Sequence, residues 1–97
     1  MAQYLVLVHF TEQGIKNIKD SPKRAAAASA MAKKVGAKIK EVYWTLGAYD
    51  GVVILEAPDD ETITAWSLNM GVLGFVRTET LRAFPAKDFA TILDKMT

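Results

Sequence analysis

The side chains most suited to chemistry lie in a stretch near the middle of the chain, from Leu46 to Gly51, that has the composition of a tight hairpin turn. Its two glycines, Gly47 and Gly51, are expected to supply the positions with φ > 0. Within it, Tyr49 and Asp50 bring together a phenol and a carboxylate, which could orient a ligand or move a proton. The structural alternative is that Asp50 accepts N–H groups of its own turn while Tyr49 packs over the hairpin. Residue spacing leaves both roles open.

The only histidine, His9, lies near the end of an expected strand, on a face that it shares with Leu5 and Leu7. It suits either of two roles, a half-buried residue held by a partner or a general base. If the first and third strands are neighbours, His9 shares a cavity with Tyr49 and Asp50. Because the chain has no second histidine and no cysteine, a zinc site would have to rely on carboxylates, and we predict no metal.

Three further side chains are candidates for ligand binding. Arg24 lies in the first turn of an expected helix, where the helix dipole disfavours a cation, so a carboxylate partner such as Asp20 or Asp50 is suggested, with a solvated surface position as the alternative. Arg77 suits an acidic ligand or a cross-strand pair. Trp44 suits an aromatic pocket, the core or a dimer contact. No catalytic role is assigned to any of these candidates.

Composition narrows the classes of function. Of 97 residues, 51% are hydrophobic and 24% are charged, as in ordinary soluble domains, and no apolar run approaches the ~20 residues of a membrane span. Lys and Arg number 12 against 11 Asp and Glu, a net charge of +1 that favours neither nucleic acid nor a membrane as partner. The strand pattern begins too close to Met1 for a leader, so we expect a cytoplasmic protein. The sequence shows no phosphate-binding loop or nucleophile elbow, and we predict no cofactor.

Two segments in the first half have the residue pattern of strands. Residues 3–10 are almost continuously apolar, which is typical of a strand buried on both faces, and Thr11 is placed to cap a short helical turn after it. Residues 38–46 form the second expected strand, with no purely apolar face. Strict alternation along it puts Ile39 and Val42 on opposite faces.

A helix is expected between these strands. Ser21 can cap its free N–H groups, and Pro22 at the first helical position loses no hydrogen bond. The helix runs to about Val35, where Gly36 is free to adopt the left-handed conformation that ends it. Its alanine-rich middle has strong helix propensity and little bulk, so the helix can approach a sheet closely.

The second half of the sequence predicts four elements, in the order strand, helix, strand and helix. Residues 51–57 are the most strongly strand-like run and favour the centre of a sheet. Asp59 is placed to cap a helix whose apolar stripe runs to Leu73. Residues 75–84 carry alternating charges, as an edge strand or a partly wet face does. The last expected helix is amphipathic, with its apolar stripe at Phe89, Ile92, Leu93 and Met96.

The order β-α-β-β-α-β indicates an α+β, ferredoxin-like fold, a single domain over residues 1–97. It has a four-stranded antiparallel sheet with both helices on one face, followed by the C-terminal helix. The uncovered face carries bulky apolar side chains such as Leu5 and Leu7. Because such a face is stabilised by a partner, we predict a homodimer that packs sheet on sheet, with a larger homo-oligomer left open.

Three separated segments carry a family resemblance: Gly47 to Asp50 between two strands, residues 10–16 before them, and residues 75–84 after them. In this order, over nearly the whole chain, they resemble the GYD domain family. The resemblance implies the dimeric α/β-barrel superfamily, in which two ferredoxin-like subunits pack their sheets together. That superfamily includes cofactor-free monooxygenases, haem-degrading enzymes, isomerases and stress-response proteins. None of their catalytic motifs matches this sequence, and the family is named for a motif and not for an activity.

Three functions of different classes remain open. The first is a homo-oligomeric, non-catalytic module that binds a small, partly apolar molecule between sheet and helices, with His9, Trp44, Tyr49 and Asp50 lining the pocket. The second is a cofactor-independent monooxygenase or isomerase in which His9 or Asp50 is the base. The third is an interaction or assembly protein without a pocket.

Overall fold

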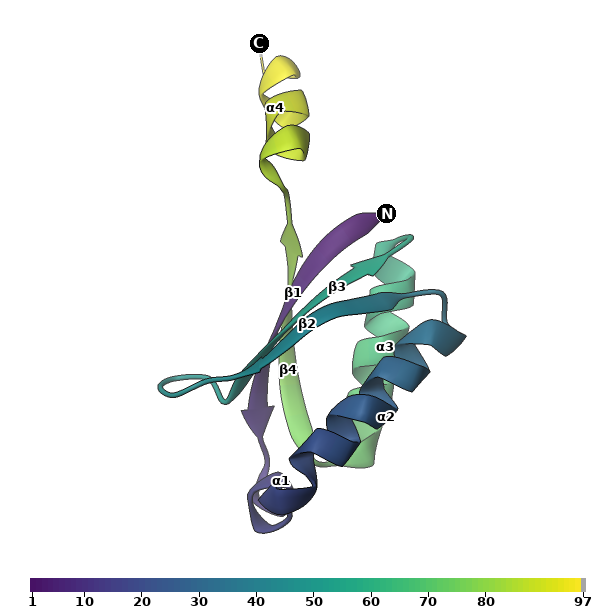
Figure 1. The fold of residues 1–97 in the computed structure, drawn as a ribbon. Helices are drawn as coiled ribbons and strands as arrows, with labels where there is room; N and C mark the ends of the chain where they lie inside the picture. Colours follow the sequence, from purple (N-terminus) through teal and green to yellow (C-terminus); the bar gives the residue numbers. More distant parts are fainter. Residues whose placement is uncertain (97) are drawn as a thin grey trace.

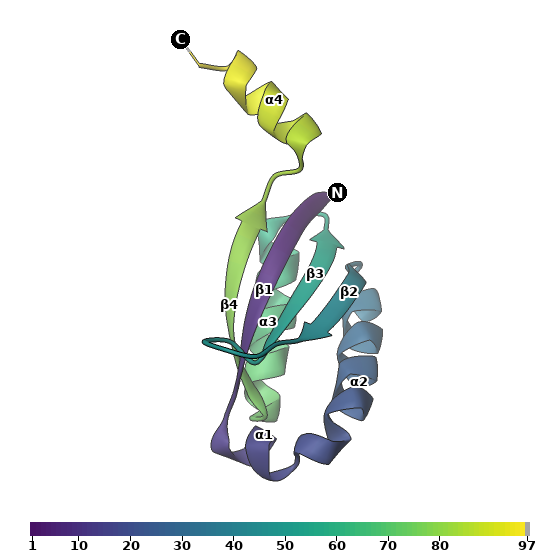
Figure 2. The same ribbon diagram turned by 60° about the vertical axis from the view of Figure 1, so that its left-hand side comes forward.

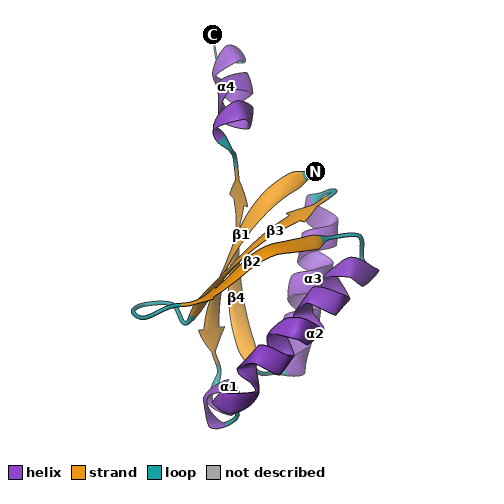
Figure 3. Ribbon diagram, in the orientation of Figure 1, coloured by secondary structure: helices purple, strands orange, loops and turns teal. Residues whose placement is uncertain are grey.

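A four-stranded antiparallel sheet frames the molecule, with its strands in the order β2-β3-β1-β4 (Figures 1 and 3). The computed structural model describes residues 1–96. The strands are β1 (Ala2–Phe10), β2 (Lys38–Trp44), β3 (Gly51–Ala57) and β4 (Val76–Ala83). The helices are α1 (Glu12–Lys16), α2 (Ser21–Lys34), α3 (Asp60–Leu73) and α4 (Ala86–Asp94), with a 3₁₀ turn at Ile18–Asp20. The ferredoxin-like order predicted from the sequence is confirmed, as is the additional C-terminal helix.

Helices α2 and α3 cover one face of the sheet, and the core lies between them and the strands (Figures 1 and 2). Val6, Leu55 and Trp66 are its largest fully buried side chains. The Trp66 indole N–H donates to the Ala28 carbonyl at 3.0 Å, which ties α3 to α2. Ala32 of α2 is fully buried as well, so the small side chains of this helix let it lie close to the sheet.

The position of each strand in the sheet follows from its residue pattern. β3 and β1 are the central pair, and β4 lies at an edge. Along β3, buried and half-buried residues alternate through the whole strand. The predictions that residues 51–57 occupy the sheet centre and that residues 75–84 form an edge strand are therefore confirmed.

The start of α2 differs from the expectation. The N-cap position belongs to Asp20, whose side chain makes no capping hydrogen bond, and Ser21 is already helical. The buried Ser21 hydroxyl instead accepts the Trp44 indole N–H at 2.9 Å. The prediction that Ser21 caps the helix is wrong because its oxygen serves a residue 23 positions away on β2. Gly36 has φ +85°, and the predicted left-handed end of this helix is confirmed.

The register of β2 against β3 shifts after Ile39, where Lys40 forms a β-bulge. Ile39 opposes Leu55, and Val42 opposes Val53, so both pack against the helix-covered core. The prediction that Ile39 and Val42 lie on opposite faces is wrong because the bulge inserts one residue into the two-residue period.

The sheet face opposite the helices carries an apolar group of side chains. We call this the open face, and its apolar members are Leu5, Leu7, Val52, Ile54 and Leu81. The members on β1 and β3 are half-buried by their neighbours, while Leu81 on β4 is 47% exposed. Within residues 1–96 no helix lies over this face (Figure 2).

Helix α4 leaves the end of β4 and stands clear of the sheet and the other helices in both views (Figures 1 and 2). The predicted amphipathic helix is confirmed, and its apolar stripe is uncovered: Phe89, Ile92, Leu93 and Met96 are 36 to 71% exposed. None of the helices in the described chain has the length and hydropathy needed to cross a membrane.

A buried phenol makes the stability of the fold sensitive to alkaline pH. Burial raises the pKa of Tyr4 from 10.0 to about 12, with a further contribution from its hydrogen bond to Asp60. Because the folded state holds this proton more tightly, Tyr4 adds stability that is fully present below pH 10 and is lost as the pH rises through 12. We expect the free energy of unfolding, measured by urea denaturation, to fall less steeply over this interval in Tyr4→Phe. Equal slopes for both chains would contradict this.

Candidate functional site

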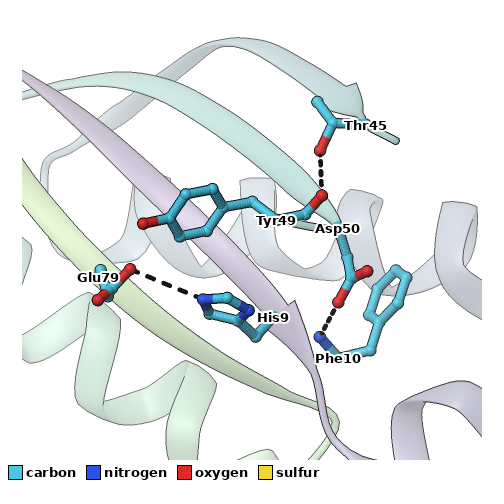
Figure 4. A network of polar contacts seen from close by, with 6 residues as sticks. All are labelled: His9, Phe10, Thr45, Tyr49, Asp50 and Glu79. Carbon is cyan, nitrogen blue, oxygen red and sulfur yellow. Dashed lines mark hydrogen bonds and ion pairs between the residues drawn. The ribbon is translucent and has the colours of Figure 1, made fainter. Parts of the chain in front are cut away.

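The hairpin between β2 and β3 is closed by hydrogen bonds of Thr45. Its backbone N–H donates to the Asp50 carbonyl at 3.0 Å. Its hydroxyl donates to the Tyr49 carbonyl at 2.6 Å (Figure 4). Gly47 has φ +122°, as expected for a tight reversal. Gly51 does not have a positive φ: it is buried in β3, where a Cβ would lie 3.1 Å from a carbonyl oxygen of β2. The positive φ predicted for both glycines is therefore confirmed only for Gly47, and close strand approach explains Gly51.

Asp50 ties this hairpin to the end of β1. Its carboxylate oxygen Oδ2 accepts the Phe10 N–H at 2.8 Å (Figure 4). Its own N–H donates to the Val8 carbonyl at 2.8 Å. The side chain thus adds one hydrogen bond beyond the β1–β3 ladder. The expected bond within its own turn is replaced by a bond to a neighbouring strand.

Tyr49 folds over the open face, where it meets His9 and Glu79 (Figure 4). The rings of Tyr49 and His9 have centroids 4.7 Å apart, and His9 Nε2 lies 3.7 Å from a carboxylate oxygen of Glu79. The neighbouring Glu79 carboxylate raises the pKa of Tyr49. Arg77 opposes His9 in the β1–β4 ladder, so it also belongs to this face. We call these four residues the polar cluster.

A cavity of about 100 Å³ lies on the other side of the sheet, against helices α2 and α3. We call it the helix-side cavity. Its walls are almost wholly apolar, with polar side chains at Ser21, Arg24, Asp50 and Thr78. Trp44 also lines it, fixed by the hydrogen bond of its indole to Ser21. The volume is somewhat smaller than the apolar cavity of about 150 Å³ that binds benzene in an engineered protein, so it suits a small apolar group.

Arg24 is held at this cavity by a carbonyl and an aromatic ring. One of its amino groups donates to the Asn17 carbonyl at 2.8 Å, and the guanidinium carbon lies 4.5 Å from the centroid of the Phe75 ring. Among residues 1–96 Arg24 forms no ion pair with Asp20 or Asp50. The carboxylate partner suggested by the sequence is therefore wrong. The carbonyl at the end of α1 satisfies the cation instead, at the negative pole of that short helix.

The sheet divides the candidate residues between its two sides. The helix-side cavity is lined by Trp44, Asp50 and Arg24, whereas the polar cluster holds His9, Tyr49 and Arg77. Alternation along β1 turns His9 away from the face that carries Phe10, so His9 does not share the cavity with Asp50. No group of three potential metal ligands occurs in the described part of the chain.

Two residues of these sites were not singled out from the sequence. Phe75 lines the helix-side cavity, and Glu79 completes the polar cluster. The signal for Glu79 lies in the β1–β4 register, where it opposes Leu7. Once the sequence pattern of β1 is assigned to faces, antiparallel pairing assigns Glu79 to the open face as well.

The sequence model described as GYD domain matches residues 4–93, which span the hairpin, all of the sheet except the first two residues of β1, and most of α4. The chain belongs to the GYD domain family. The resemblance stated from three short segments is thereby confirmed over nearly the whole sequence.

Two similar proteins come from Thermus thermophilus. A protein named glutamine synthetase and cystathionine beta-lyase binding protein is 30% identical to this GYD domain over 89 residues, which cover 91% of this chain and 94% of the relative. The crystal structure of TTHA0845 is 28% identical, with a TM-score of 0.53, and the match covers 89% of this chain and 96% of that one. This solved structure supports the fold.

Proposed function

We propose that this GYD domain is a homodimeric, non-catalytic module whose helix-side cavity binds a small, partly apolar molecule. The observation that carries the proposal is the cavity, about 100 Å³ of almost wholly apolar wall with a few polar side chains. An oxygenase or isomerase would need a base beside its substrate. His9, the one histidine of the sequence, lies across the sheet from the cavity, so it is not beside a ligand there and the geometry favours binding over catalysis.

The homodimer is proposed to form through the open face. The apolar side chains of this face are contiguous on β1 and β3, with Leu5 beside Ile54 and Leu7 beside Val52. Covering them with the same face of a second copy removes apolar area from water, which is worth roughly 25 cal/mol per Å². The helix-side cavity lies on the opposite side of the sheet, so this dimer leaves it accessible.

Filling the cavity tests the binding proposal. Benzoate or 4-methylpentanoate at ten times its Kd is expected to stabilise the chain by about 1.4 kcal/mol, about 6 °C in melting temperature for a domain of this size. Ala25→Leu adds bulk at the cavity wall and is expected to abolish the shift. Ala26→Leu, at an exposed position of the same helix, is the matched control and should keep it. If no compound in a broad set of small apolar and aromatic acids shifts the melting temperature, the proposal fails.

A second function, binding to a partner enzyme, is favoured by a specific observation. The Thermus thermophilus relative is named as a binding protein for glutamine synthetase and cystathionine beta-lyase. Helix α4 offers such a partner an uncovered apolar stripe. We therefore propose enzyme binding as an additional role, which a binding titration of either enzyme against the immobilised GYD domain decides.

A further inference from the structure

We propose that the helix-side cavity binds a free α-amino acid with a small apolar side chain, its ammonium group at Asp50 and its carboxylate at Arg24. This inference rests on the proposed function and specifies the ligand class. It follows from the hydrogen-bonding capacity of the two charged residues, from the absence of an ion pair between them among the described residues, and from the size and polarity of the cavity that both line.

Asp50 retains capacity to accept hydrogen bonds. Its Oδ2 binds the Phe10 N–H, while Oδ1 has no hydrogen-bond partner within residues 1–96. No buried side-chain oxygen in that range lacks a partner, so Oδ1 is reachable from solvent. An ionised carboxylate has about four acceptor sites, and an ammonium group is the donor that matches both its charge and its free oxygen.

Arg24 retains capacity to donate. Its contacts are the Asn17 carbonyl at 2.8 Å, a longer one of 3.5 Å to the Gly14 carbonyl, and the face of the Phe75 ring. A guanidinium group carries five N–H donors, so some of the Arg24 donors remain available for a ligand. Stacking on Phe75 holds the guanidinium plane in place, and a planar donor fork matches the geometry of a carboxylate.

The two charges do not satisfy each other. Arg24 and Asp50 line the same cavity, yet they form no ion pair within the described residues, so their charged atoms are more than 4.0 Å apart. A simple anion or cation would match one of them and leave the other beside an apolar wall. A zwitterion carries both charges on one molecule, so it offers a charge-assisted partner to each of the two residues that line this cavity.

The apolar part of the cavity limits the side chain of this amino acid. Val42, Val53, Trp66 and Met70 are among the residues that line it. A volume of about 100 Å³, below the roughly 150 Å³ that binds benzene, fits a branched four-carbon or thioether side chain. The cavity therefore favours leucine, isoleucine or methionine over tryptophan.

Calorimetric titration of the full chain tests the head-group recognition. The probes are L-leucine, 4-methylpentanoate, which lacks the ammonium group, and 3-methylbutylamine, which lacks the carboxylate. Leucine is expected to bind at least about tenfold more tightly than either analogue, since each analogue loses one set of charge-assisted hydrogen bonds.

Two variants assign the head groups to their residues. Asp50→Asn keeps an oxygen for the Phe10 N–H and removes the charge, so leucine should bind at least about tenfold more weakly while 4-methylpentanoate is unaffected. Arg24→Gln should weaken leucine equally and leave 3-methylbutylamine unaffected. The exposed charge changes Glu61→Gln and Lys33→Gln are controls that should bind leucine as the wild type does.

Each contrary outcome has a distinct meaning. Equal affinity for leucine and 4-methylpentanoate would overturn the amino-acid proposal and leave the cavity-binding function in place. The same holds if no amino acid binds while benzoate still raises the melting temperature. If every probe fails, benzoate included, both proposals are overturned.

Discussion

Gly14→Ala is expected to destabilise the GYD domain severely. A Cβ at this position would lie 2.1 Å from the Phe75 carbonyl oxygen and 3.2 Å from its carbonyl carbon. Both are backbone atoms, and the same carbonyl accepts the Thr11 N–H at 3.1 Å, so the clash separates α1 from the start of β4. Overpacking of this kind costs about 3 kcal/mol or more, out of a total of about 5 to 15 kcal/mol. The free energy of unfolding in urea measures the loss.

Gly71→Ala is the matched control for this change. Gly71 is exposed within α3, has no positive φ, and a Cβ there would have no atom within 4 Å. Because alanine costs less backbone entropy in a helix, this variant is expected to gain about 0.5 to 1 kcal/mol. A Gly14→Ala chain as stable as wild type would show that the Phe75 carbonyl can move without cost.

Features that depend on neighbouring residues were predictable from the sequence. Thr11 accepts the Gly14 N–H at 3.1 Å, and Asp59 accepts the Thr62 N–H at 2.9 Å, so both predicted helix caps are confirmed. Caps bind atoms two or three residues away, and strand order follows from element order and burial pattern. These determinants are all present in the local sequence.

Features that depend on distant residues were not predictable in the same way. The Ser21 hydroxyl serves Trp44 on another element, and Asp50 serves Phe10, 40 positions away. Each side chain has the residue type expected of a local cap or turn, and only the folded chain brings its distant partner to it. The bulge at Lys40 is also set by pairing with β3, which residue alternation within β2 does not reveal.

The hairpin itself shows why the candidate site divides between two sides of the sheet. Tyr49 and Asp50 are adjacent, yet Tyr49 contacts His9 on the open face while Asp50 lines the helix-side cavity. Regular alternation ends at Gly51, the first residue of β3, so the strand period does not assign these two side chains. Sequence adjacency suggested one site, whereas the geometry places the tyrosine on the open face and the aspartate at the helix-side cavity.

Leu7→Lys is expected to convert the proposed homodimer into a monomer. Leu7 is half-buried at the middle of the open face, between Val52 on β3 and Glu79 on β4. A lysine there can pair with Glu79 within one chain, which limits the cost to folding. In a sheet-on-sheet dimer its ammonium group would lose water on an apolar face, at a cost of several kcal/mol. Light scattering should give twice the chain mass of 10.6 kDa for wild type and 10.6 kDa for the variant.

Leu68→Lys is the control that separates the open face from exposed leucines in general. Leu68 is 66% exposed on α3, so the charge stays in water and the mass should remain that of a dimer. A wild-type chain of 10.6 kDa, or a Leu7→Lys chain that stays dimeric, would rule out the open face as the interface. Because the helix-side cavity lies across the sheet, the Leu7→Lys monomer should still bind the small ligand, so dimer formation and ligand binding are tested independently.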